Sequence, residues 1–459
     1  MHIEFFGAAR EVTGSCHILH LGGDTILLDC GMIQGGIERE ARNADPFPFD
    51  PRCIDAVVLS HAHIDHCGRL PLLVKHGFKG SVHTHQASRA LTSILLRDSA
   101  NLAASRARHA ESSPDETSKE GPLYDLRDVE RTLPMLIGHP YRHWFDVLPG
   151  VKVRFLDAGH ILVSGVVEVH LHQSDTHRRI VFSGDLGQYD SPILRDPESP
   201  READLVVMES TYGDRRHKDR ARSLLELGDL IRDSDTNRST IVVPAFAVGR
   251  SQELLYQLGK HAGEWALHRW EIFLDSPLAI EATAIYWRHQ HLFDEEADAL
   301  RREFESMPEL PNLHFARTAD ESKRISRLGK GAIIIAGSGT CGGGRILHHL
   351  KIMLSDRENH VLFTGYQPPG GLGRRLIDGA DKVWIHGQSV EVNAQIHTIG
   401  GLSAHGDYED LLRWYRGIQG KPPVYLVHGD PAAMQALQFR LTTAAAKVHI
   451  PEPGERISF

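Results

Sequence analysis

Short apolar runs, each ending in a polar or glycine-containing loop, recur through the first 210 residues of the chain. Runs of about four to eight residues that are rich in β-branched side chains predict buried strands. Longer amphipathic segments predict helices at 86–110 and 125–136, whereas the polar stretch 110–121 has no periodicity and predicts a loop. We expect strands at residues 2–7, 15–21, 25–29, 55–59, 151–157, 166–171, 179–183 and 204–209.

From residue 211 the pattern changes, because short apolar strands now alternate with helical stretches. Such alternation predicts a parallel α/β unit. After residue 390 the earlier pattern of a strand followed by a His- or Asp-containing loop returns. We therefore predict a first domain built from residues 1–210 and 391–459, with a second domain of residues 211–390 inserted into it.

Composition narrows the class of protein. A chain of 459 residues is long enough for two or three domains, and 41% hydrophobic with 24% charged residues describes a globular protein with an ample core. The formal net charge of −9 excludes a globally basic nucleic-acid binder. Five cysteines without a Cys-x-x-Cys pair indicate a reducing compartment and no thiolate metal site. No apolar run reaches membrane-spanning length and no signal-peptide pattern is present, so we expect a cytoplasmic protein without a membrane partner.

The densest cluster of reactive side chains follows the apolar run 55–59, where His61, His63, Asp65 and His66 fall within six residues. The next segment can start a helix, so the cluster lies on a strand-to-helix loop on which side chains can converge. Imidazole and carboxylate are the ligands that zinc prefers when no thiolate is offered. Because the chain has 30 histidines, some of them can fall close together by chance. The pattern His-x-His followed by Asp-His nevertheless favours a metal site over a solvated loop.

Single polar residues directly follow several other apolar strands, at positions where a loop can approach a metal closely. Taken alone, each is explained as well by a capping or turn role. Asp29 is a candidate to orient a ligand histidine by accepting its second N–H. The others are His160, Asp185 and Glu209 in the first part of the chain, and His405 and His428 in the last part.

Together and in this order, these residues resemble the motifs of metallo-β-lactamase-fold enzymes and, among them, the β-CASP nucleases. The resemblance covers almost the whole chain and extends to the segments 243–250, 275–279 and 365–367. It implies an α/β fold in which a metallo-β-lactamase αββα sandwich carries an inserted parallel α/β β-CASP domain. The chain resembles the single-chain bacterial RNA nucleases of this family and the endonuclease subunit of the pre-mRNA cleavage and polyadenylation machinery.

The resemblance also implies a ligand set for two zinc ions per chain. The first zinc would be held by His61, His63, His160 and Asp185. The second would be held by Asp65, His66, Asp185 and His428, so that Asp185 bridges the two ions. Two such metals can stabilise both the attacking and the leaving oxygen of a phosphodiester. Of the catalytic residues Asp65, Glu209 and His405, we expect His405 to act as general acid and Glu209 to orient it.

RNA is the substrate that the resemblance favours, because the DNA-cleaving branch usually has an aliphatic residue where His428 stands. The N-terminal KH modules of archaeal members and the long extension of RNase J are missing from the sequence, which favours an endonuclease while leaving 5′-exonuclease activity open.

Alternatives are a DNA nuclease of this family and a thioester hydrolase of the same fold. A non-catalytic subunit would lack metal ligands, and none is missing. We expect single-stranded RNA as the partner, and a homodimer stays open.

A glycine-rich segment, Gly337-Ser-Gly-Thr-Cys-Gly342, follows a predicted strand and precedes a helix. It matches the dinucleotide-binding pattern, but the same geometry forms a nest of backbone N–H groups that binds any phosphate. A tight turn without a ligand is the plain alternative. In a nuclease the loop would hold the RNA backbone. The residues that we predict to contact RNA are Arg250, Ser276, Ser338, Gly339, Thr340, Gly343, Arg345 and Gln367.

Overall fold

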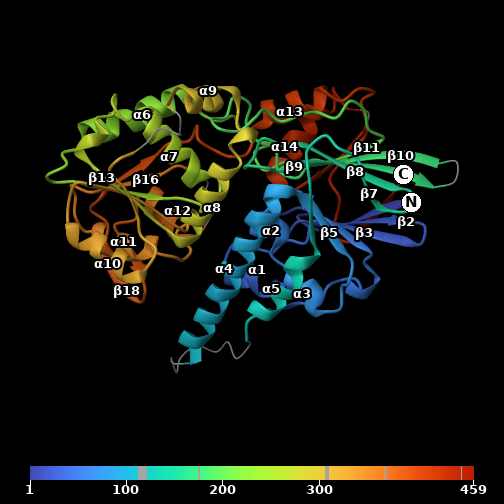
Figure 1. The fold of residues 1–459 in the computed structure, drawn as a ribbon, viewed down its shortest axis with the longest axis horizontal. Helices are drawn as coiled ribbons and strands as arrows, with labels where there is room; N and C mark the ends of the chain where they lie inside the picture. Colours follow the sequence, from blue (N-terminus) through green and yellow to red (C-terminus); the bar gives the residue numbers. More distant parts are fainter. Residues whose placement is uncertain (112–120, 174–175, 305–309, 366, 369, 446) are drawn as a thin grey trace. The chain divides into compact units, whose positions relative to one another are not determined.

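The computed structural model describes residues 1–111, 121–173, 176–304, 310–365, 367–368, 370–445 and 447–459. Most of the predicted loop at 110–121 therefore lies outside the described residues. The chain forms two compact units, one of residues 1–216 and 405–459 and one of residues 217–404. The first unit contains both chain ends, so the blue N-terminal segment and the red C-terminal segment in Figure 1 are parts of the same unit.

The first unit contains two seven-stranded sheets. One has the order β22 (Glu455–Ser458), β1 (His2–Gly7), β2 (Cys16–Leu21), β3 (Asp24–Leu28), β4 (Ala56–Val58), β5 (Ser81–His85) and β6 (Leu136–His139). The other has the order β21 (Val448–His449), β20 (Val424–Val427), β11 (Leu205–Glu209), β10 (Thr176–Phe182), β9 (Gly165–Gln173), β8 (Val151–Asp157) and β7 (Phe145–Leu148). Because β1 pairs with β22, the two ends of the chain lie in neighbouring strands.

The two sheets share one core, and helices cover their outer faces. Ile3 and Phe5 of β1 pack with Val167 and Val169 of β9 between the sheets. A second cluster joins the outer face of the first sheet to α2 (Ile64–Cys67), α3 (Leu70–Lys75), α4 (Gln86–Glu111) and α5 (Leu126–Thr132). A third joins the second sheet to α13 (Tyr408–Arg416) and α14 (Pro431–Leu441). The layers are helix, sheet, sheet and helix, which confirms the predicted αββα sandwich.

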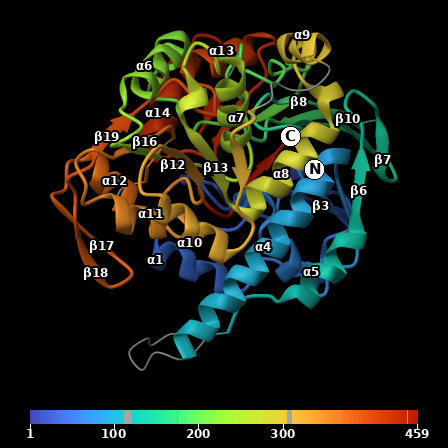
Figure 2. The same ribbon diagram turned by 60° about the vertical axis from the view of Figure 1, so that its left-hand side comes forward.

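The second unit is a six-stranded sheet in which every pairing is parallel, as the sequence predicted. Its order is β14 (Leu313–Phe315), β13 (Glu271–Asp275), β15 (Ala332–Ala336), β12 (Thr240–Pro244), β16 (His360–Phe363) and β19 (Gln395–Thr398). One face packs on α6 (Arg220–Asp233), α7 (Arg250–Lys260) and α8 (Pro277–Arg288). The other packs on α10 (Ala319–Leu328), α11 (Ile346–Met353) and α12 (Leu372–Ile377), as Figure 2 shows. Further elements are α9 (Glu295–Phe304) and the hairpin of β17 (Lys382–Ile385) and β18 (Gln388–Glu391).

The units divide at 216/217 and 404/405, whereas the sequence placed the domain boundaries at 210/211 and 390/391. The larger difference comes from β19, which the sequence assigned to the returning part of the first domain. In the structure β19 pairs in parallel with β16 of the second unit. An apolar pattern predicts a strand but does not identify its partner strand. Within the described part of the chain, no helix combines the length and apolar character needed to cross a bilayer.

The short helix α2 is held by backbone hydrogen bonds to its carbonyl oxygens. The N–H groups of Ser15, Cys30 and Met32 donate to the carbonyls of Asp65, His66 and Ile64 at 2.8, 2.8 and 2.9 Å. The chain after β3 lies so close to α2 that a Cβ atom on Gly31 would be 1.6 Å from the Asp65 carbonyl oxygen. The sequence predicts a loop at Asp65 and His66, whereas the structure places them on α2, which gives both side chains a fixed direction.

Gly31→Ala should therefore destabilise the protein, because the added methyl group must push α2 away from the loop after β3. Overpacking of this kind costs about 1–3 kcal/mol of unfolding free energy. Gly23→Ala is the matched control, since nothing lies within 4 Å of a Cβ atom at Gly23. Chemical denaturation of both variants measures the effect, and equal stability would show that this close approach is not needed.

Candidate metal centre

Seven side chains from four separate segments of the first unit converge at one site. The loop after β4 and the helix α2 supply the first four, and the chain leaving β8, β10 and β20 supplies the other three. Their ligand atoms form two groups, within each of which all atoms lie within 4.8 Å of one another. The first group is His61, His63, His160 and Asp185, and the second is Asp65, His66 and His428. The structure thus brings together all seven residues that we predicted as ligands.

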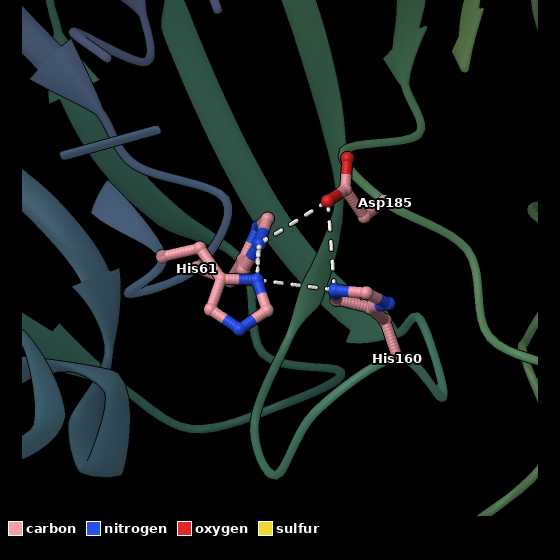
Figure 3. Close-up of side chains that lie close together, drawn as sticks. His61, His160 and Asp185 are labelled. Carbon is pink, nitrogen blue, oxygen red and sulfur yellow. Dashed lines mark hydrogen bonds and ion pairs between the residues drawn. The ribbon is translucent and has the colours of Figure 1, made fainter. Parts of the chain in front are cut away.

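In the first group, four ligand atoms point toward a common centre. His63 Nδ1 lies 3.1 Å from His61 Nε2 and 3.2 Å from His160 Nε2. Asp185 Oδ2 lies 3.4 Å from His61 Nε2 and 3.5 Å from His160 Nε2, and Figure 3 shows these side chains facing one another. Zinc bonds of about 2.0–2.2 Å in a tetrahedron place the ligand atoms roughly 3.4 Å apart. The spacing therefore fits one tetrahedral ion.

The second group shares the Asp185 carboxylate with the first. Asp185 Oδ1 lies 3.2 Å from His66 Nε2 and 3.5 Å from His428 Nε2. Asp65 Oδ2 lies 3.5 Å from His428 Nε2, and the two imidazole Nε2 atoms are 3.2 Å apart. One oxygen of Asp185 thus faces each group. Within the described chain Oδ1 accepts no hydrogen bond, although Asp185 is 2% exposed. A buried carboxylate oxygen left in this way suits a cation.

The electrostatics of the cluster also suit a cation. Burial lowers the pKa of His61 and of His63, so both imidazoles are neutral, which is the form that binds a metal. Burial alone would lower the pKa of His66 too, but the carboxylates of Asp185, Asp29 and Asp65 raise it well above its ordinary value. The site therefore attracts positive charge strongly. Burial disfavours the ionised form of Asp185, yet the surrounding imidazoles hold its pKa well below the ordinary value.

A layer of hydrogen bonds orients the ligand histidines. Asp29 is fully buried and accepts a hydrogen bond from His66 Nδ1 at 2.7 Å, which leaves His66 Nε2 directed at the site. The backbone N–H and hydroxyl of Ser60 donate to the same carboxylate at 2.8 and 2.9 Å. Ser60 Oγ is also 3.1 Å from His61 Nδ1, and Thr211 Oγ1 is 3.1 Å from His428 Nδ1. Neither hydroxyl was predicted from the sequence, where the one signal was that Ser60 directly precedes His61.

Glu209 and His405 form a pair beside the metal ligands. Glu209 is fully buried, and its Oε1 lies 3.2 Å from His405 Nδ1. The same carboxylate accepts hydrogen bonds from the N–H of Leu186 at 2.6 Å and of Thr211 at 3.2 Å, so its orientation is set by the backbone. The His405 ring stacks 4.4 Å from the ring of His160. Burial lowers the pKa of His405, but the adjacent Glu209 carboxylate more than offsets this and raises it to about 9.

The residues predicted to contact RNA lie in the second unit, and several are engaged there. Ser276 caps α8 by accepting the N–H of Ala279 at 3.2 Å. Gln367 donates to the carbonyl of Gly339 at 2.8 Å, and Ser338 Oγ accepts the N–H of Gly342 at 3.1 Å. These contacts shape the loop that contains Gly339, Thr340 and Gly343. Arg250 is 6% exposed and pairs with the carboxylate of Glu253, so it is not the solvated surface charge that an isolated arginine suggests.

Arg345 is the clearest difference between the predicted and the observed environment. Its guanidinium donates to the buried carboxylate of Asp275 at 2.6 Å and to the carbonyls of Ala316 and Arg317 at 2.8 and 2.7 Å. Asp275 also binds His349 Nε2 at 2.6 Å. Arg345 therefore anchors the end of the glycine-rich loop, and its guanidinium is bonded to groups of the protein itself. The sequence could not show this, since Asp275 is 70 residues away.

Similarity to known protein families and sequences extends over almost the whole chain. Family models match a metallo-beta-lactamase superfamily domain over residues 9–238, a Beta-Casp domain over 251–376 and a Zn-dependent metallo-hydrolase RNA specificity domain over 389–451. The chain is 39% identical over 457 residues to "Ribonuclease TTHA0252" of Thermus thermophilus, which covers 100% of both chains. It is 30% identical over 452 residues to "Transcription termination factor FttA" of Methanosarcina mazei, covering 94% of this chain and 67% of that one.

A solved structure from Enterococcus faecalis V583, of a protein of unknown function, superposes with a TM-score of 0.54 at 13% identity. It covers 100% of this chain and 99% of its own, and at this identity it shows a shared fold alone.

The position of Asp185 between the two ligand groups yields a test of the shared site. Asp185→Asn removes the charge and offers a ligand oxygen on one side only, so the purified variant should hold fewer metal ions per chain than the unchanged protein. Metal content is measured by mass spectrometry after dialysis. Asp204→Asn is the control, because Asp204 is exposed and bonds the backbone of Arg179. Equal metal content in both variants would contradict the sharing of Asp185.

Proposed function

The chain belongs to the β-CASP nucleases of the metallo-beta-lactamase superfamily, and we propose that it is a zinc-dependent ribonuclease that cuts single-stranded RNA internally. The observation that carries this proposal is the pair of ligand groups that share Asp185, with Glu209 and His405 beside them. A thioester hydrolase or a lactamase would need neither this pair nor the second domain. The full-length relative that bears the name ribonuclease supports RNA over DNA, and so does the histidine at position 428.

Two zinc ions are the proposed occupancy of the site. The donor set of imidazoles and carboxylates without thiolate fits zinc. When bound, two such ions would polarise the phosphodiester and lower the pKa of the attacking water toward neutrality. Asp185 and Asp65 would offset part of the positive charge of two zinc ions and leave a net positive site for a phosphodiester, and Asp29 and Thr211 hold the imidazoles of His66 and His428 in their ligand orientation.

His405 is the proposed general acid. When a phosphodiester is cut, the departing oxygen leaves as a costly alkoxide unless a proton is supplied. The Nδ1 atom of His405 faces Glu209, and we assign proton delivery to the other ring nitrogen, Nε2. Glu209 stabilises the protonated ring and also fixes its direction, because its two oxygens are bonded to backbone N–H groups. Glu209 thus acts through His405 as a positioning residue.

His405→Ala should lower the cleavage rate about 10²–10⁴-fold while the metal content stays unchanged. The decisive test uses an RNA in which sulfur takes the place of the departing oxygen at the cleaved bond. The sulfur leaves as a thiolate and needs no proton. The variant should cleave this substrate at close to the rate of the unchanged protein. His61→Ala, which removes a metal ligand, is the control that sulfur should not rescue. If His405→Ala sheds metal, or if sulfur gives no rescue, His405 is not the acid.

Glu209→Gln should change the pH profile of cleavage. His405 must be protonated to act, so the rate falls as the pH rises through the pKa of His405. Because Glu209 raises that pKa, its replacement by glutamine lowers it, and the alkaline fall of the rate should begin at a lower pH. Rates on the RNA substrate are measured between about pH 6 and 10 for both proteins. An unchanged profile would remove Glu209 from this role.

Internal cutting is tested with a circular single-stranded RNA, which has no 5′ end for an exonuclease to enter. We expect the circle to be opened to a linear product, and a circular DNA of the same base sequence to stay intact. Gel separation of circles from linear chains reads the result. RNA circles that survive while linear RNA is degraded would show a 5′-exonuclease, and opening of the DNA circle would favour the DNA-cleaving branch.

A further inference from the structure

A further group of potential metal ligands, away from the two groups around Asp185, lies on the outer face of the first sheet. His2 and Glu4 are two residues apart on β1, so their side chains project from the same face of the strand. His20 on β2 is the direct cross-strand partner of His2. The intervening residues Ile3 and Leu19 point the other way, into the core between the sheets. Sheet geometry alone therefore gathers two imidazoles and one carboxylate.

The ligand atoms of these three residues are already close to coordination distance. All of them lie within 4.8 Å of one another, and His20 Nε2 is 3.4 Å from Glu4 Oε2. The rings of His2 and His20 stack with centroids 4.2 Å apart. The Nε2 atoms of both rings are buried and have no hydrogen-bond partner in the described chain. Two buried ring nitrogens that make no hydrogen bond, beside a carboxylate, are an arrangement that a cation would complete.

We propose that His2, Glu4 and His20 bind one zinc-type divalent ion, separate from the centre built around Asp185. Two imidazoles and one carboxylate are a donor set that zinc accepts, with water in the remaining position. Tetrahedral zinc needs ligand atoms roughly 3.4 Å apart, so only small side-chain rotations are required. Burial and the neighbouring positive groups lower the pKa of His2, which keeps its imidazole in the neutral, metal-binding form.

Arg456 is the competitor for this ion. Its Nε lies 3.0 Å from Glu4 Oε2, so in this arrangement the guanidinium neutralises the carboxylate. Arg456 is the cross-strand neighbour of Glu4 on β22, and its side chain is 67% exposed. Being largely exposed, it can turn into solvent when an ion binds. Removing this arginine should therefore strengthen ion binding.

The role of the site is structural. β1 lies between β22 and β2, and an ion held by residues of β1 and β2 would link the first strand of the chain to its neighbour. An ion that binds the folded state stabilises it by mass action. Because the site is built without any residue of the Asp185 centre, its loss should leave RNA cleavage unchanged.

The experiment compares His20→Gln with His76→Gln, an exposed histidine outside the ligand groups. Each protein is equilibrated with zinc, dialysed and analysed for zinc by mass spectrometry, and its thermal unfolding is followed with and without added zinc. We expect His20→Gln to hold one zinc fewer per chain than the unchanged protein and the control. It should also lose part of the zinc-induced rise in melting temperature, and its cleavage of RNA should stay unchanged.

Arg456→Gln supplies a second test with the opposite sign. It should bind the additional zinc more tightly, as measured by competition with a coloured chelator, because the competing cation is gone. The proposal is overturned if His20→Gln holds as much zinc as the control, or if Arg456→Gln leaves the chelator competition unchanged. Neither result depends on the proposed ribonuclease activity, so a failure here is separable from a failure there.

Discussion

The carboxylate of Asp185, buried between imidazoles, is the interaction on which the first unit depends. Each of its oxygens faces a different ligand group, His61 and His160 on one side and His66 and His428 on the other. Burying this carboxylate among imidazoles is costly without compensating positive charge, which the proposed metal ions would provide. The chemistry and the stability of the site therefore have the same origin.

The two sheets of the sandwich position these side chains at one point. Strands of both sheets end there, and the loops that follow them are tied together by backbone hydrogen bonds, such as those from Ser15 and Cys30 to the carbonyls of α2. Asp29 and Ser60 then fix the imidazole directions. Loss of such supporting contacts typically lowers metal affinity or activity about 10–100-fold.

The second unit also buries a carboxylate, but there side chains of the protein compensate its charge. There the buried carboxylate of Asp275 is neutralised by Arg345 and hydrogen-bonded by His349, without any need for a metal. The network holds the start of α11 against the end of β13, and so helps to set the shape of the glycine-rich loop that joins β15 to α11. A loop with a fixed backbone can present its N–H groups to a phosphate without further ordering.

The sequence by itself determined the local features. Apolar periodicity predicted many strands of both units, although not β5, β6 or β7, and the spacing of His61, His63, Asp65 and His66 predicted a metal site, because both depend on neighbours within a few residues. Only the tertiary structure decided the partners. It paired β19 with β16, gave Arg345 to Asp275, placed Thr211 against His428 and set His20 opposite His2. These contacts join residues far apart in the chain, and side-chain chemistry alone cannot select among the many acids and histidines that would serve.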